Sequence, residues 1–123
     1  MKDLTMPTRP HFLLAFALAG VFSCSAEDPV ADDNAVVRVT VSSNQFSPAA
    51  VTIKAGRTVR WTWAGGTHNV VSGENCTPDG TFKSGEPQGG GTFEQKFETP
   101  GTFPYFCRPH CSMGMTGTVV VTE

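Results

Sequence analysis

The chain has 123 residues, which is enough for one domain but not for two. Its formal net charge is −2, and from residue 35 onward seven Lys and Arg face six Asp and Glu. Because these charges form neither a basic stripe nor a block of one sign, the sequence argues against a nucleic-acid-binding protein and indicates no charged partner.

Residues 1–23 have the features of an export signal. Lys2 and Arg9 precede an uncharged apolar run at residues 12–22. The run is shorter than the roughly 20 apolar residues that a membrane-spanning helix needs, and it lacks the polar face and periodicity of a buried helix. A basic start, a short apolar core and small residues after it are typical of a secretory signal. We therefore expect an exported protein.

Two cleavage sites compete after the apolar run. Residues 21–24 (VFSC) resemble a bacterial lipoprotein box, in which Cys24 is lipidated and becomes the first residue, although Phe22 is bulkier than this pattern usually carries. Alternatively, Cys24-Ser25-Ala26 offers small residues ahead of a cut before Glu27. The lipoprotein cut before Cys24 is favoured, because a lone Cys directly after an export signal is otherwise hard to explain. The expected location is periplasmic or in the cell envelope, with a lipid on Cys24 as the only membrane attachment.

Residues 24–34 are predicted to form a disordered acidic tether. The stretch 27–34 (EDPVADDN) is polar, acidic and poor in apolar side chains. Such a segment cannot bury enough surface to offset the entropy that it loses on ordering. The folded domain is therefore expected to span residues 35–123.

From residue 35 onward the apolar residues recur with period two, which is the pattern of half-buried β-strands. The clearest run alternates Val59, Trp61 and Trp63 with Arg60 and Thr62. The same alternation recurs at residues 37–41, 51–53, 93–97, 103–107 and 119–121. In the run 93–97, Gln95 interrupts the apolar face.

Turn-forming residues separate these runs, and no helical stripe of useful length follows the signal. The turn residues are Asn44, Pro48, Gly56, Gly65-Gly66, Gly89-Gly90-Gly91 and Pro100-Gly101. Short strands between Gly and Pro turns predict an all-β protein, an antiparallel sandwich or barrel. Residues 72–91 have no periodicity and are expected to form a long loop, with room for a short helix or strand inside.

The side chains that could bind a metal gather in two short segments. His68 follows the strand at residues 59–63, and a thiolate, an imidazole and a thioether lie within the nine residues 107–115. Two imidazoles and a thiolate with a weak axial thioether form the copper site of electron-transfer proteins. Zinc usually takes Cys and His without Met. The sequence therefore predicts one copper ion that alternates between Cu(I) and Cu(II).

These residues resemble the ligand motif of the cupredoxins. The segment that begins at Cys107 has the C-x2-H-x4-M spacing of plastocyanin and pseudoazurin, and the similarity covers residues 35–123. It includes a His-Asn-Val element at residues 68–70 and the Met-x-Gly-x-Val ending that starts at Met115. The resemblance implies a Greek-key β-sandwich of the cupredoxin type, with about seven or eight strands and a type 1 (blue) copper site near one end. The metal ligands that it implies are His68, Cys107, His110 and Met115.

Two methionines compete for the axial position. Met113 would give a shorter H-x2-M spacing, which some members of the family use. The ligand Met of the family is followed by x-Gly-x-Val, which matches Met115. Met115 also shares strand parity with Val119 and Val121, so its side chain is expected to point inward. Met115 is therefore the predicted axial ligand, and Met113 a surface residue beside the site.

Asn69 is expected to fasten the two ligand loops together by a side-chain hydrogen bond. In plastocyanin-like loops the residue after the ligand Cys is usually a hydroxyl that meets this Asn. Arg108 stands at that position here, so the sequence leaves the partner of Asn69 open. Arg108 is instead a candidate for a solvated charge near the partner surface.

Two cysteines remain, Cys76 and Cys111. Paired thiols of an exported protein are expected to oxidise, and each of the two follows a candidate ligand His in the sequence. The pair resembles that of plant phytocyanins, in which a Cys beside the ligand His bridges to the loop after the first ligand. The alternative is a two-copper site built on Cys107 and Cys111, but that site needs a His at the position of Met115.

The leading functional hypothesis is a monomeric carrier that passes single electrons between redox proteins. Its expected docking surface is an apolar patch around His110, formed by Pro109, Met113, Gly65 and Gly66. A copper storage or delivery module is the alternative, and a metal-free adhesion-type sandwich would leave the ligand set unexplained. An enzyme is not expected, because a full ligand set leaves no open position for a substrate.

Overall fold

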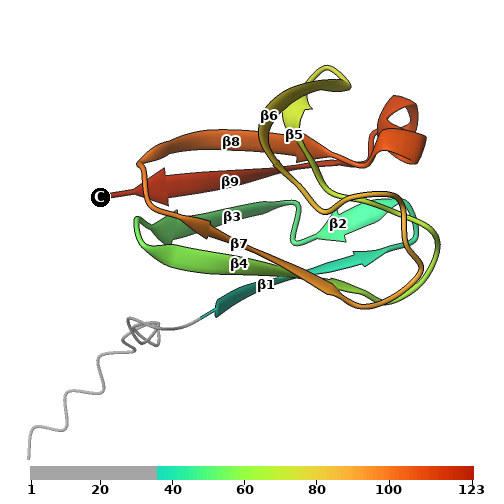
Figure 1. Ribbon diagram of the computed structural model, residues 1–123, viewed down its shortest axis with the longest axis horizontal. Helices are drawn as coiled ribbons and strands as arrows, with labels where there is room; N and C mark the ends of the chain where they lie inside the picture. Colours follow the sequence, from blue (N-terminus) through green and yellow to red (C-terminus); the bar gives the residue numbers. More distant parts are fainter. Residues whose placement is uncertain (1–35) are drawn as a thin grey trace, which may run out of the picture.

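The computed structural model describes residues 36–123, which form two β-sheets packed face to face (Figure 1). The predicted signal and tether lie outside the described residues and stay predictions. The strands are β1 (Val36–Ser42), β2 (Gln45–Ser47), β3 (Ala50–Lys54), β4 (Arg57–Trp63), β5 (Val71–Glu74), β6 (Thr77–Lys83), β7 (Thr92–Phe97), β8 (Gly101–Phe106) and β9 (Thr116–Thr122). One sheet has the order β2-β1-β4-β7 and the other β3-β9-β8-β5-β6.

The expected all-β sandwich is confirmed, but its strands are not all antiparallel. β1 pairs with β4 and β3 pairs with β9 in parallel, whereas the other pairs are antiparallel. The chain passes from one sheet to the other between β2 and β3 and returns between β3 and β4. Strands that are not consecutive therefore become neighbours. Periodicity shows which face of a strand is buried and says nothing about the neighbouring strand, which is why the sequence did not indicate the parallel pairs.

The alternating residues fill the space between the sheets as predicted. Val59, Trp61 and Trp63 of β4 are all buried, and Trp61 lies at the centre of the core. Its indole packs edge-on against the Tyr105 ring, with the ring centroids 5.3 Å apart. Gln95 is only half-buried because β7 is the edge strand of its sheet, so its polar side chain reaches water.

Residues 72–91, expected to be mainly a loop, contain the hairpin of β5 and β6. Asn75 and Cys76 form its turn, both with positive φ, which is the backbone conformation of a tight hairpin turn. The hairpin escapes sequence analysis because β6 is an outer strand that buries only Phe82 and so shows no alternation. Within residues 36–123 no helix is long and apolar enough to cross a membrane.

Candidate metal centre

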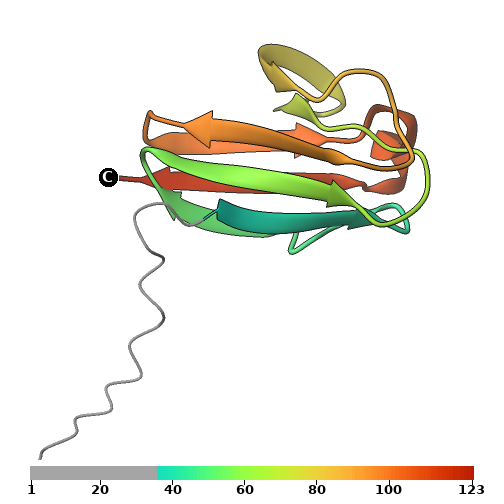
Figure 2. The same cartoon turned by 60° about the horizontal axis from the view of Figure 1, so that its bottom comes forward.

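Three of the predicted ligands converge at one end of the sandwich. His68 comes from the loop after β4, Cys107 directly follows β8, and His110 lies in η1 (Arg108–Met113), a 3-10 helix. Figure 2 shows η1 and the loop after β4 at the same end of the molecule. The donor atoms of the three residues all lie within 4.8 Å of one another.

The three donor atoms form a triangle of the size that a metal ion needs. The Nδ1 atoms of His68 and His110 are 3.0 Å apart. The Cys107 Sγ lies 3.8 Å from the His68 Nδ1 and 3.5 Å from the His110 Nδ1. The point equidistant from these three atoms is about 2.0 Å from each, close to the ~2.0–2.3 Å of metal–nitrogen and metal–sulfur bonds in proteins. The residues therefore fit one metal ion.

Met115 is tied to the same loop by its backbone. Its carbonyl accepts a hydrogen bond from the Cys107 N–H at 3.0 Å, and its own N–H donates to the His110 carbonyl at 3.2 Å. The Met115 side chain is fully buried, whereas the Met113 side chain is 60% exposed. This difference in burial supports Met115 over Met113 as the thioether of the site.

Burial favours the neutral form of the upstream imidazole. His68 is almost fully buried, and desolvation, followed by the nearby His110, lowers the pKa of His68, while the Gly65 backbone acts in the opposite direction. A neutral imidazole has a free lone pair for a metal. Gly66 packs directly against the other ring nitrogen, Nε2, where a Cβ would overlap the ring.

Asn69 links the two ligand loops, as expected, although Arg108 has no hydroxyl to offer. The Asn69 Oδ1 accepts a hydrogen bond from the backbone N–H of Arg108 at 2.8 Å. The Asn69 Nδ2 donates to the Gly85 carbonyl at 3.1 Å. A main-chain amide thus takes the place of the missing hydroxyl. Because nearly every residue has such an amide, the identity of residue 108 does not reveal this bond.

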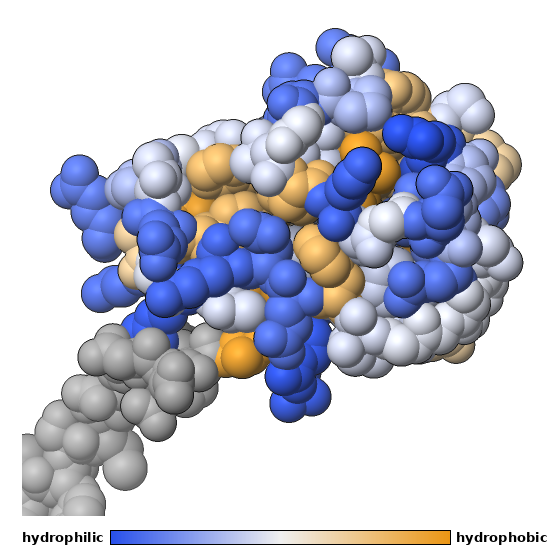
Figure 3. Space-filling view, in the orientation of Figure 1, coloured by the Kyte–Doolittle hydropathy of each residue, from blue (hydrophilic) through white to orange (hydrophobic). Residues whose placement is uncertain are grey.

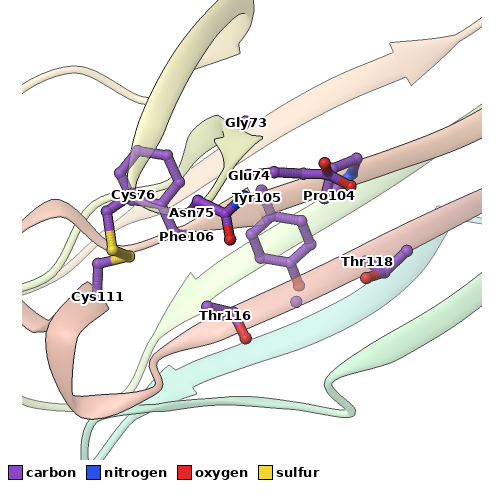
Figure 4. Close-up of a pocket in the computed structure, with 11 residues that line it drawn as sticks. Gly73, Glu74, Asn75, Cys76, Pro104, Tyr105, Phe106, Cys111, Thr116 and Thr118 are labelled. Carbon is purple, nitrogen blue, oxygen red and sulfur yellow. A yellow bond between two sulfur atoms is a disulfide. The ribbon is translucent and has the colours of Figure 1, made fainter.

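A disulfide between Cys76 and Cys111 ties the β5–β6 turn to η1, with the two Cα atoms 5.8 Å apart. The predicted pairing is therefore present, and Cys107 is the free cysteine among the described residues. The two-copper alternative is wrong, because a disulfide-bonded Cys111 has no thiolate for a metal. The disulfide also forms one wall of a hollow of about 500 Å³ on the outer face of β8 and β9 (Figure 4).

Comparison with known proteins identifies the family. The family of copper binding proteins of the plastocyanin/azurin type matches residues 34–122. This chain belongs to the plastocyanin/azurin family. The predicted cupredoxin resemblance is confirmed, and so is copper as the cofactor.

Individual relatives agree with this assignment. The chain is 42% identical over 83 residues to a plastocyanin of Scenedesmus fuscus, covering 62% of this chain and 85% of the relative. It is 40% identical over 99 residues to a halocyanin of Natronomonas pharaonis, covering 76% of this chain and 60% of that relative. The solved structure of pseudoazurin from Methylobacterium extorquens superposes with a TM-score of 0.59 at 29% identity, covering 72% of this chain and 76% of the pseudoazurin.

The sequence did not indicate the backbone groups that hold His68, the upstream candidate ligand. The backbone of Gln88 pairs with that of His68 through two hydrogen bonds of 3.0 and 2.8 Å. The Trp63 indole N–H donates to the His68 carbonyl at 2.8 Å. Gln88 lies in a stretch without periodicity, and its contribution is a main-chain one, so no side-chain pattern could have indicated it.

Proposed function

We propose that this protein transfers single electrons through one type 1 copper ion held by His68, Cys107, His110 and Met115. The supporting observation is the triangle of two imidazole nitrogens and a thiol sulfur, with sides of 3.0 to 3.8 Å. Copper supplies the redox chemistry of such a site by alternating between its two oxidation states.

The chain itself keeps the donor atoms in place. The backbone bonds of Met115, the bridge made by Asn69 and the Cys76–Cys111 disulfide each hold part of the ligand loop. Donors that are fixed in this way rearrange little when the metal changes charge, which favours fast electron transfer. Four ligands also close the coordination shell, so we propose an electron carrier and not an enzyme.

His110 is the proposed point of electron exchange. Its ring is half-buried, whereas His68 and Cys107 are almost completely buried. The His110 side chain also lines a shallow hollow of about 290 Å³ together with Gly65 and Gly66. With Pro109 and the 60% exposed Met113, these glycines form the proposed apolar docking patch for redox proteins. Small, weakly charged surfaces suit the short-lived encounters of electron transfer.

The copper-delivery alternative is less well supported. It relied on an accessible thiol pair at Cys107 and Cys111 that could pass a metal to a partner. The Cys107 side chain is fully buried, and Cys111 is in a disulfide. Electron transfer is therefore the function that the site supports best.

We further propose that the carrier is an exported monomer with a lipid anchor at Cys24, in the periplasm or cell envelope. The support is the sequence pattern of residues 1–23, followed by the acidic stretch 24–34 ahead of the domain at 35–123. A radiolabelled fatty acid should mark the mature protein, and Cys24→Ala should abolish the label. An unlabelled mature form that begins at Glu27 would contradict the anchor.

The visible spectrum and an electrode test the electron-transfer proposal directly. The copper(II) protein should show the intense visible band of a copper–thiolate bond, and it should exchange one electron reversibly at the electrode. A colourless protein would contradict the proposed ligand set. A coloured protein that does not alternate reversibly between two copper states would instead favour copper delivery.

A further inference from the structure

A groove of about 400 Å³ lies between the β5–β6 hairpin and the start of η1. Its apolar lining includes Val71, Pro78 and Phe82, and its two charged lining residues are Lys83 and Arg108. Figure 3 shows hydrophobic surface between strongly hydrophilic side chains in this region, at the upper right, where Figure 1 places the hairpin next to η1. The groove thus combines an apolar floor with two positively charged lining side chains.

Neither cation is neutralised within the described part of the chain. Both side chains are exposed, and residues 36–123 give Lys83 and Arg108 no ion pair and no side-chain hydrogen bond. Asp79, the carboxylate of the same hairpin, accepts hydrogen bonds from the Ser72 hydroxyl at 2.6 Å and from the Thr81 N–H at 2.9 Å. Its charge is therefore engaged with the hairpin itself, and it does not line the groove.

The groove lies next to the metal centre. Arg108 directly follows Cys107, and its N–H is the group that Asn69 holds. Val71, in the floor, is the cross-strand partner of Phe106, the residue before Cys107. A protein segment bound in this groove would therefore touch Arg108, which is covalently bonded to Cys107, and Val71, which pairs with the residue before Cys107.

We propose that this groove binds an acidic segment of a redox partner. Two unpaired cations beside an apolar floor complement a segment that carries carboxylates beside apolar side chains. The groove would add orientation and attraction to contact at the apolar patch around His110. This inference rests on the proposed electron-transfer function, since it names the chemistry of the partner.

Nuclear magnetic resonance locates the binding site, with a peptide of eight glutamates as the probe and the diamagnetic copper(I) protein as the target. The amides of residues 81–83 and Arg108 should shift as the peptide is added. The variant Lys83→Glu/Arg108→Glu should lose these shifts, whereas Arg38→Glu/Lys54→Glu, with the same change of charge at exposed positions of β1 and β3, should keep them. Shifts confined to Gly65, Gly66 and Met113, or equal shifts in both variants, would overturn the proposal.

Kinetics with an anionic oxidant give the second readout. Charged surface residues change rates of association by about tenfold or more at low salt. Oxidation of the copper(I) protein by hexacyanoferrate(III) should therefore slow by about tenfold in Lys83→Glu/Arg108→Glu and by less than about twofold in Arg38→Glu/Lys54→Glu. The difference should shrink in ~1 M salt, where charges are screened within about 3 Å. Equal oxidation rates in the two variants at low salt would contradict the proposal that the groove attracts anionic partners.

The proposed function and the groove fail in different ways. Both variants should keep the visible band and the reversible electrode response of the unchanged protein. Loss of these signals in the unchanged protein would contradict electron transfer, while peptide binding at Lys83 and Arg108 would still be measurable. A normal band and response with no peptide shift at the groove would contradict the groove alone.

Discussion

Each side chain around the copper centre has a separable role, and Cys107 has the most distinctive one. It is fully buried, and its sulfur lies within 4 Å of the Nδ1 atoms of both His68 and His110. Because thiolate-to-copper charge transfer gives a type 1 site its colour, Cys107 should determine the spectrum, whereas the weak axial ligand should only tune the potential.

Replacing Cys107 tests this assignment. Cys107→Ser should fold normally, since the hydroxyl is close in size to the thiol, but the copper protein should lose its intense visible band. Met115→Leu is the matched control, and it should keep the band while the reduction potential changes. Absorption spectra of both variants, with circular dichroism to verify folding, are the measurements. A Cys107→Ser protein that stays blue would refute the ligand assignment.

Tyr105, the one tyrosine of the chain, offers a spectroscopic view of the core. The Tyr105 side chain is buried without a hydrogen-bond partner for its hydroxyl. Burial raises the pKa of Tyr105 to about 12, while the interaction with Trp61 acts in the opposite direction. An unfolded tyrosine ionises near pH ~10.

An alkaline titration should therefore separate the folded from the unfolded protein. Because the folded-state pKa is the higher one, the neutral Tyr105 stabilises the fold fully below pH ~10, and this contribution is lost as the pH rises toward 12. Tyrosinate absorbance should appear near pH 12 in the folded protein and about two pH units lower in urea. Ionisation of the folded protein near pH ~10 would show that Tyr105 is in contact with water.

Gly117 lies beside Tyr105 on the neighbouring strand, and its lack of a side chain makes room for the tyrosine ring. Gly117 and Tyr105 are cross-strand partners in β9 and β8, and a Cβ on Gly117 would overlap the Tyr105 ring. The Tyr105 ring cannot easily move away, because it packs edge-on against the rings of both Phe46 and Trp61.

Gly117→Ala should consequently destabilise the protein by about 1–3 kcal/mol, the usual cost of overpacking a core. Gly90→Ala is a suitable control, because a Cβ there would meet nothing within 4 Å. Urea unfolding followed by tryptophan fluorescence measures both free energies. A Gly117→Ala protein as stable as the control would mean that the Tyr105 ring has room to shift.

At the scale of structural elements, the β5–β6 hairpin and η1 are held together by one covalent bond. The Cys76–Cys111 disulfide joins the hairpin turn to the residue after His110, across 35 positions of the sequence. The β6 strand of the hairpin packs little apolar surface, since Phe82 is its one buried side chain. The disulfide should therefore account for much of the connection between the hairpin and the ligand loop.

Removing this bond with Cys76→Ser/Cys111→Ser should lower the free energy of unfolding by about 2–4 kcal/mol, as is typical for loops of this length. The visible band should remain, because neither residue is a proposed ligand. Urea unfolding and the absorption spectrum are the measurements, and unreduced peptide mapping of the unchanged protein should find the two cysteine peptides linked. Recovery of Cys76 as a free thiol from oxidised, copper-loaded protein would refute the disulfide.

At the scale of the whole molecule, the proposed electron transfer depends on which end of the sandwich meets the redox partner. The C-terminus lies at the end of the sandwich opposite η1 (Figure 1). Met113 is the large hydrophobic residue that stands out as exposed within residues 36–123, and it lies on η1 beside His110. An exposed apolar side chain beside a redox centre favours a docking role.

A charge at this position should disturb docking without changing the metal. Met113→Glu should slow electron exchange with a redox partner by about tenfold, since a carboxylate must then lose water in an apolar contact. Its visible spectrum should match that of the unchanged protein. Met113→Leu is the control and should exchange electrons at the normal rate. Stopped-flow rates that are equal for the two variants would place the docking surface elsewhere.

The sequence alone determines the features that depend on residue type and local spacing. Alternation in the run of Val59, Trp61 and Trp63 identifies the inward face of β4, because successive side chains of a strand point to opposite sides. The x-Gly-x-Val ending that follows Met115, and does not follow Met113, distinguishes the two methionines. The spacing from Cys107 to His110 and Met115 predicts the ligand loop, since a metal selects its ligands by atom type.

Only the tertiary structure decides which distant groups become neighbours. The parallel pairing of β1 with β4, the bond from Asn69 to the Arg108 amide, and the shared groove of Lys83 and Arg108 each join segments far apart in the chain. Backbone amides and carbonyls are the same in nearly every residue, so a sequence does not reveal their partners. Two cations 25 positions apart look like isolated surface charges until the chain folds. The chemistry of each side chain follows from its residue type, whereas contacts between distant residues depend on the path of the whole chain.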